Sequence, residues 1–174
     1  MKNLGYLDRI LVEYERSFDI HREYEIGDKK IDAYGYFNSY SEKYLLVKEV
    51  QLWETKAFEH IFFIEKENVD SSTLEDLLSL IPSYIEPNLV RNGNKYPEKN
   101  HMYSFITLVI LAENISDLET IKRVKKYKFE KNYLFSFRGY SQARVILVDT
   151  KNKNIYSNKS GKTLEKLYKY LIKK

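Results

Sequence analysis

The spacing of hydrophobic residues changes along the chain and divides it into segments of two kinds. Near the start, apolar residues stand three or four positions apart, as at Leu7, Leu11 and Tyr14, which predicts an amphipathic helix over residues 3–17. From His21 onward apolar and polar residues alternate, a pattern typical of β-strands. The alternation predicts strands joined by short polar turns, over residues 21–26, 31–38, 44–54 and 58–65. We expect these strands to form an antiparallel meander.

Two further helices are predicted from their starting signals. Residues 72–75 (STLE) and 116–119 (SDLE) match a capping box, in which Ser72 or Ser116 accepts a hydrogen bond from a free amide of the first turn. Pro82 and Pro87 should shorten or kink the first helix, because proline has no amide hydrogen to donate. The second helix should run through residue 128, and a closing helix is predicted over residues 164–172.

The other segments of the second half are predicted from their apolar content. Residues 102–111 are apolar almost throughout, which suits a strand that is covered on both faces. Shorter strands are predicted over residues 133–137, 143–149 and 154–156, whereas residues 87–100 lack periodicity and should form a long loop. The sequence therefore predicts one α+β domain in the order α-β-β-β-β-α-β-α-β-β-β-α. We expect a largely antiparallel, twisted sheet with the helices mainly on one face.

Charge divides the chain near Val90. Residues 1–90 carry a net charge of −8 and residues 91–174 a net charge of +12, within an overall charge of +4. The loop over residues 87–100 thus marks a boundary between an acidic and a basic half inside the single domain. A basic half of this size attracts phosphate-rich partners, and the acidic half of one copy could pair with the basic half of another to give a homodimer.

Lysines alternate with aromatic residues in the basic half, most densely over residues 122–131. Grooves for single-stranded nucleic acid combine positive charge for the backbone with rings for base stacking, although a charged helical stretch is also typical of a solvated face. On the first interpretation, the second half binds nucleic acid or another polyanion. The candidate anion-binding residues are Lys122, Lys125, Lys126, Arg138, Arg144, Lys159 and Lys162.

Residues 156–163 (YSNKSGKT) contain the Gly-Lys-Thr that ends a phosphate-binding P-loop. The first glycine of that motif is missing, because Tyr156 stands in its place, and only 11 residues follow Thr163. We therefore expect no nucleotide hydrolysis. An ordinary helix start after a glycine turn explains the segment, with Lys159 and Lys162 still available to hold an anion.

Two carboxylates suggest an alternative, catalytic function. Asp32 on one predicted strand and Glu49 and Gln51 on a later one could hold a Mg²⁺ and orient water for attack on a phosphodiester. In this order of elements, residues 3–112 resemble the PD-(D/E)xK nuclease-like fold. The resemblance assigns metal ligation to Asp32 and Glu49 but puts Gln51 where that family has lysine. In the alternative interpretation, Glu49 and Gln51 face water on a half-exposed strand, and Asp32 only opens its strand after a turn.

The three histidines, His21, His60 and His101, stand about forty residues apart, so none has the close spacing of a local metal-binding pair. We expect three independent, partly buried imidazoles, unless the fold brings them together. The chain has no cysteine, which excludes disulfides, thiolate nucleophiles and thiolate metal sites and favours a reducing compartment such as the cytoplasm. Its longest apolar run, residues 105–112, is far shorter than the roughly 20 residues that cross a bilayer, so no integral membrane association is expected.

Nearly the whole chain is similar to an uncharacterised bacterial family, a domain of unknown function. The resemblance rests on short motifs: Asp32-x-Tyr34, Glu59-His60, His101-Met102-Tyr103, Lys125-Lys126-Tyr127-Lys128, Arg138-Gly139-Tyr140 and Asn158-Lys159-Ser160-Gly161-Lys162. It implies a soluble α+β domain and supplies no catalytic residue. The preferred hypothesis is therefore a binding module for an anionic partner with no cofactor, and the alternative is a Mg²⁺-dependent phosphodiesterase or a degenerate relative.

Overall fold

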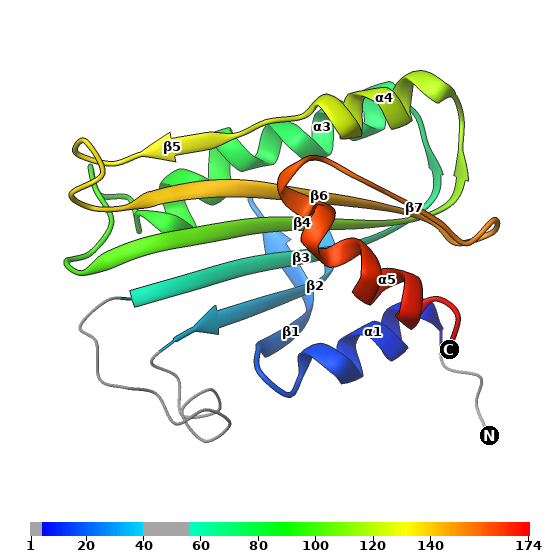
Figure 1. Cartoon of the computed structure of the whole chain (residues 1–174), viewed down its shortest axis with the longest axis horizontal. Coiled ribbons are helices and arrows are strands. Elements are labelled where there is room, and N and C mark those ends of the chain that lie inside the picture. Colours follow the sequence, from blue (N-terminus) through cyan, green and yellow to red (C-terminus); the bar gives the residue numbers. More distant parts are fainter. Residues whose placement is uncertain (1–4, 40–55) are drawn as a thin grey trace.

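A single seven-stranded sheet forms the centre of the computed structural model, which describes residues 5–39 and 56–174 (Figure 1). The strands lie in the order β1-β2-β3-β4-β6-β5; β5 pairs with the beginning of β6, and β7 pairs with its end. Their bounds are β1 Asp19–Ile26, β2 Lys29–Asn38, β3 Lys56–Val69, β4 His101–Ile115, β5 Glu130–Asn132, β6 Tyr140–Asp149 and β7 Asn154–Ser157. The predicted α+β class with one sheet is confirmed. The predicted strand over residues 44–54 lies outside the described residues.

The directions of the strands are mixed. β3 pairs with β4, and β4 with β6, in parallel, whereas the outer pairs β1–β2, β2–β3, β5–β6 and β6–β7 are antiparallel. Parallel neighbours need a crossover connection, and helices supply it between β3 and β4 and again between β4 and β6. The expectation of a largely antiparallel sheet therefore holds for the outer pairs and not for the centre.

Helices cover both faces of the sheet, not mainly one (Figure 1). One face packs against α3 Ser71–Leu80, the π-helix η1 Ile81–Val90 and α4 Leu118–Lys126, and the other against α1 Tyr6–Tyr14 and α5 Glu165–Leu171. The reason lies in β4, where Ile106 and Leu108 are buried in the first core while Val109 and Leu111 are buried in the second. A central parallel strand that is apolar on both faces must be covered on both. Each core combines residues from before and after the 87–100 segment.

Aspartates, not serines, cap the two helices that were predicted from capping boxes. The side chain of Asp70 accepts a hydrogen bond from the amide of Thr73 at 2.7 Å, and that of Asp117 accepts one from the amide of Thr120 at 2.7 Å. The true caps thus precede Ser72 by two positions and follow Ser116 by one. Aspartate caps as well as serine does, and its negative charge also favours the positive end of the helix dipole.

Pro82 changes the helical pattern without ending the helix. α3 passes at Ile81 into η1, which contains Pro87 and continues to Val90. A proline cannot donate to the carbonyl one turn back, and the wider π-type pattern, seen where the amide of Arg91 donates to the carbonyl of Glu86 at 3.1 Å, accommodates the missing donors. The loop therefore begins after Val90 and not at Pro87.

The predicted strand over residues 133–137 is wrong. β5 ends at Asn132, and the chain then turns through Leu134, Phe135 and Ser136, which all have positive φ. Tyr133, Phe135 and Phe137 alternate with polar or smaller residues as in a strand, but of these three aromatic residues only Tyr133 is buried. The helix α4 also ends earlier than predicted, at Lys126, because Tyr127 is extended.

Candidate anion-binding site

Three of the candidate lysines meet at one hollow, at the edge of the sheet beyond β7. Lys125 comes from the last turn of α4, and Lys159 and Lys162 come from the segment around η2 Ser160–Leu164, a short 3-10 helix. The hollow has a volume of about 750 Å³, and Ile155, Tyr156, Ser157 and Glu165 complete its lining. We call it the basic hollow. α4 packs on one face of the sheet and α5 on the other, so the hollow lies where the two faces meet.

The charge of the basic hollow is positive and largely uncompensated. Its single lining carboxylate, Glu165, accepts a hydrogen bond from the Ser157 hydroxyl at 2.7 Å and pairs with Lys169 Nζ at 3.5 Å. Within the part of the chain that the structure describes, Lys125, Lys159 and Lys162 form no ion pair. The ammonium group of Lys125 lies 5.7 Å from the centre of the Tyr156 ring, which favours a cation there.

The side chain of Asn158 holds the wall of the basic hollow together. Its Oδ1 accepts from the amides of Val145 and Gly161, both at 2.9 Å, and its Nδ2 donates to the carbonyls of Ala143 at 3.0 Å and Tyr127 at 3.2 Å. Because β5 and β7 pair with different parts of β6, the edge of β6 between them has no strand neighbour. The Asn158 amide fills that gap and ties the end of α4 to η2. Sequence reasoning missed this role.

The same contacts explain why Gly161-Lys162-Thr163 does not form a P-loop. The amide of Gly161, which a P-loop would offer to phosphate, donates to Asn158 instead. A Cβ atom at position 161 would lie 2.9 Å from the carbonyl oxygen of Val145, so the glycine permits close packing of η2 on β6. What this segment offers an anion is therefore the side chains of Lys159 and Lys162.

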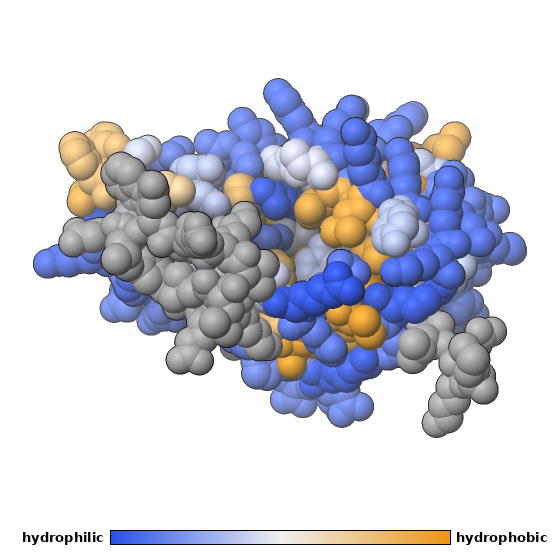
Figure 2. Space-filling model, turned by 60° about the horizontal axis from the view of Figure 1, so that its bottom comes forward, coloured by the Kyte–Doolittle hydropathy of each residue, from blue (hydrophilic) through white to orange (hydrophobic). Residues whose placement is uncertain are grey.

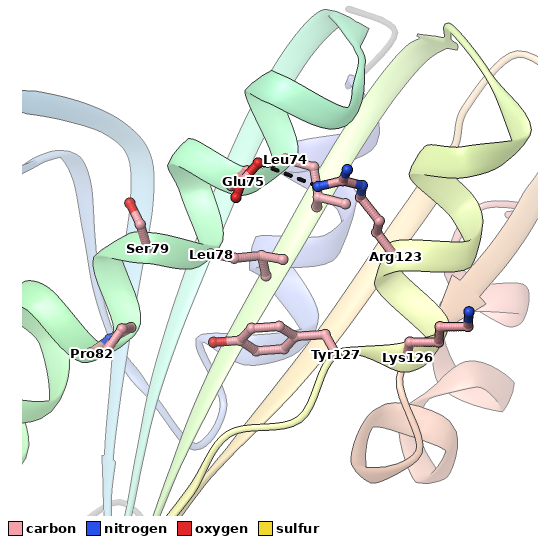
Figure 3. A pocket seen from close by; sticks show the side chains of 8 residues that line it. All are labelled: Leu74, Glu75, Leu78, Ser79, Pro82, Arg123, Lys126 and Tyr127. Atoms are coloured by element: carbon pink, nitrogen blue, oxygen red, sulfur yellow. Dashed lines mark hydrogen bonds and ion pairs between the residues drawn. The ribbon is translucent and has the colours of Figure 1, made fainter.

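Lys126 does not line the basic hollow but borders a separate apolar groove between α3 and α4 (Figure 3). The groove has a volume of about 430 Å³, and Leu74, Leu78, Pro82 and Tyr127 form the apolar part of its lining. At one end of the groove, Arg123 on α4 forms an ion pair with Glu75 on α3 at 3.3 Å (Figure 3). One of the two cations that line the groove is therefore already paired. The structure thus separates Lys125 from Lys126, because neighbours on a helix point in different directions.

The remaining basic candidates do not join the basic hollow. Lys122 is exposed on α4 and lines neither the hollow nor the groove. Arg138 lies near the start of β6, where its Nη1 donates to the carbonyl of Pro97 at 3.1 Å. Arg144 lies across the sheet from Glu59, at 3.9 Å, with its guanidinium carbon 3.4 Å from the centre of the Phe105 ring.

Glu59 is a buried carboxylate that sequence reasoning did not single out as a site. Burial raises its pKa above the ordinary value, against the opposing effects of the Thr107 hydroxyl, which donates to it at 2.6 Å, and of Arg144. The Nε of Arg144 is buried with no hydrogen-bond partner among the described residues. The signal in the sequence was an acidic residue that alternates with the apolar residues Ile61 and Phe63 of β3, both of which are buried in the second core.

Of the residues proposed for metal-dependent catalysis, the described structure includes Asp32 alone. The carboxylate of Asp32 accepts a hydrogen bond from the backbone amide of Glu65 at 2.7 Å, which links β2 to β3. Glu49 and Gln51 lie outside the described residues. Over residues 5–39 and 56–174, no group of three His, Asp or Glu side chains is arranged to hold a metal ion.

Two of the three histidines share one environment, contrary to the expectation of independent imidazoles. His60 and His101 line the same small cavity of about 40 Å³. His60 Nδ1 lies 2.8 Å from the Tyr34 hydroxyl, while His101 is held at both ring nitrogens, by the carbonyl of Arg138 at 2.7 Å and the hydroxyl of Ser104 at 2.8 Å. Burial lowers the pKa of His60 to about 4, with a smaller effect from His101.

In the described part of the chain, the helices are all too short or too polar to cross a bilayer. A search of the curated proteins and a search of the solved structures each found no match to this chain. A family profile, in contrast, matches residues 2–170, which is almost the full length. The chain therefore belongs to the family described as Domain of unknown function (DUF8052).

Proposed function

We propose that the protein is a non-enzymatic module that binds a phosphate-rich polyanion, in the first place a nucleic acid, at the basic hollow. One observation carries the proposal: three lysines from separate segments converge on one concave surface, and none of them has an ion-pair partner among the described residues. Cations that are held together without counter-charges attract phosphates and release the counterions that surround a nucleic acid. The Tyr156 ring adds an aromatic surface beside them.

The proposal predicts how strongly salt should weaken binding. For single strands, each neutralised phosphate contributes about −0.7 to the slope of log K against log salt concentration, so three lysine contacts give a slope of about −2. Affinity should be weak at physiological salt, because the site offers few contacts. Lys122 and Lys126 add only long-range attraction, since neither lines the basic hollow.

A fluorescent single-stranded oligonucleotide, titrated with the full chain at several salt concentrations, tests the proposal. Lys125→Gln, Lys159→Gln and Lys162→Gln should each weaken binding and reduce the slope by about one contact. Lys122→Gln is the matched control, because it removes the same charge from an exposed position on α4. Equal losses for Lys122→Gln and Lys125→Gln would show that only net charge matters and would contradict a defined site.

The same variants and oligonucleotide also distinguish the other candidate functions, when dimerisation and cleavage are measured beside binding. If the acidic half pairs with the basic half of a second copy, the chain should dimerise at low salt, and the Lys125→Gln variant should lose dimerisation instead of oligonucleotide binding. If the chain is a phosphodiesterase, the oligonucleotide should be cleaved once Mg²⁺ is added, and Asp32→Asn should prevent the cleavage. A cytoplasmic location, which the lack of cysteine favours, would bring the protein into contact with nucleic acids.

A further inference from the structure

The turn between β5 and β6 exposes two phenylalanines almost completely. Phe135 is 93% and Phe137 84% exposed, and Leu134 and Met102 nearby are 41% and 44% exposed. Figure 2 shows an apolar projection at the same end of the molecule where Figure 1 places this turn. Large apolar side chains gathered at one exposed point mark a contact with something outside the chain. We call residues 134–137 the aromatic tip.

The backbone of the aromatic tip adopts a conformation that its residues disfavour. Leu134, Phe135 and Ser136 have φ values of 48°, 50° and 70°, in the left-handed region that suits glycine. Hydrogen bonds close the turn, from the amide of Phe137 to the carbonyl of Leu134 at 2.9 Å and from that of Arg138 to the carbonyl of Tyr133 at 3.1 Å. Strained backbone of this kind persists where the surrounding structure fixes it, commonly at binding sites.

The base of the aromatic tip is firmly anchored. Tyr133, next to the tip, is 2% exposed, and its hydroxyl lies 2.8 Å from Glu86 Oε1 and 2.7 Å from the Ser141 hydroxyl. On the other side, a Cβ atom at Gly139 would collide with the carbonyl oxygen of Met102, so only glycine allows this close approach. The chain therefore buries a tyrosine and displays two phenylalanines on a rigid base.

The surroundings of the aromatic tip are positively charged. Phe137 lines a shallow hollow of about 590 Å³ together with Lys99 and Arg138. The carboxylate of Glu98, which precedes Lys99 in the chain, already pairs with Lys56 at 3.2 Å. Among the described residues, neither Lys99 nor Arg138 forms an ion pair. Exposed rings beside such cations match a surface that is apolar inside and anionic outside.

We propose that the aromatic tip binds the surface of an anionic lipid bilayer. Phe135 and Phe137 enter the boundary between headgroups and acyl chains, and Lys99 and Arg138 lie against the lipid phosphates. The contact is peripheral, since it needs no membrane-spanning helix. It goes beyond the proposed function and uses other residues: the aromatic tip follows β5, which pairs with the beginning of β6, whereas the basic hollow lies beside β7, which pairs with its end.

Co-sedimentation of the full chain with unilamellar vesicles tests the proposal. Vesicles of phosphatidylcholine with phosphatidylglycerol should bind the chain, and those of phosphatidylcholine alone should bind it much more weakly. The double variant Phe135→Ser/Phe137→Ser should lose affinity about tenfold or more, because two apolar rings no longer leave water. Leu118→Ser is the matched control, since Leu118 is also exposed, at 74%, but lies at the start of α4.

A second measurement locates the contact. Because the chain has no cysteine, Ser136→Cys can be labelled uniquely with an environment-sensitive dye, and Lys169→Cys on α5 provides the reference position. The emission should shift to the blue on adding anionic vesicles for the label at 136 and not at 169. Binding that survives the double phenylalanine substitution but fails in Lys125→Gln would assign lipid binding to the basic hollow and overturn the proposal. Loss of self-association in the double variant, without any vesicle binding by the unaltered chain, would also overturn it.

Discussion

The hydroxyl groups of Tyr14 and Tyr168 lie 2.9 Å apart, although 154 positions separate the two residues. The contact joins α1 to α5 inside the second core, where Tyr14 also packs edge-on against the Phe63 ring at 5.2 Å. Burial raises the pKa of both phenols, so both stay neutral and one donates to the other. Helices from the two ends of the described chain are thus tied together above the sheet.

Removing both of these hydroxyls should cost less stability than the sum of removing each one alone. Tyr14→Phe leaves the fully buried hydroxyl of Tyr168 without its partner, and we expect a loss of about 1–2 kcal/mol in the free energy of unfolding. The double variant Tyr14→Phe/Tyr168→Phe should lose less than the sum of the single variants, by about 1 kcal/mol. Urea denaturation of the parent chain, the two single variants and the double variant measures these differences. Tyr170→Phe, at an exposed position, is the control. Strict additivity would show that the hydrogen bond contributes nothing.

Asn158 should be intolerant of even an isosteric change. Asn158→Ala leaves two amides and two carbonyls without their side-chain partner, with an expected loss of about 3 kcal/mol. Asn158→Asp should also destabilise the fold, because its second oxygen would face the carbonyls of Ala143 and Tyr127. Denaturation midpoints at pH 7 check both variants, and Asn154→Ala, exposed in β7, should change stability by less than about 0.5 kcal/mol. An Asn158→Asp variant as stable as the parent would contradict the described network.

Stability should fall as the pH is lowered below about 6.5. Burial lowers the pKa of His60 to about 4, from about 6.5 in the unfolded chain, so between these values the unfolded state binds more protons. The stabilisation is complete above pH 6.5 and lost progressively towards pH 4, by about 3 kcal/mol. Burial also lowers the pKa of His101, which adds to the loss of stability at low pH.

Denaturation at a series of pH values tests this dependence. His60→Phe keeps a ring beside Tyr34 but cannot titrate, so its stability should depend less steeply on pH between 6.5 and 4. His21→Asn, at an exposed position of β1, is the control. If the stability of His60→Phe falls with decreasing pH as steeply as that of the parent chain, the buried imidazole is not the group that causes the pH dependence.

The sequence by itself determined the elements that depend on local spacing. The residues of α1 that were expected to be buried, Leu7, Leu11 and Tyr14, are buried. The continuous apolar run of β4 predicted coverage on both faces of that strand, and the structure confirms it. Such patterns succeed because the period of buried positions is set by backbone geometry alone.

Signals that several residues can satisfy were placed less accurately. Both capping boxes marked true helix starts, but Asp70 and Asp117 act as caps, because aspartate and serine compete for the same amides. The alternation of Tyr133, Phe135 and Phe137 predicted a strand, and the chain turns there instead. The sequence alone does not distinguish an apolar residue that is buried in the core from one that is exposed on a turn.

Tertiary structure alone decided which candidates act together. Lys125 and Lys126 are neighbours in sequence but line different hollows, while Lys125 meets Lys159 and Lys162 only because Asn158 fastens η2 and the end of α4 to the edge of β6. His60 and His101 converge because β3 and β4 pair in parallel, a direction set by the helical crossover between them. Charge and residue type are fixed by the sequence, whereas the distances between charges depend on strand order, which arises from long-range packing.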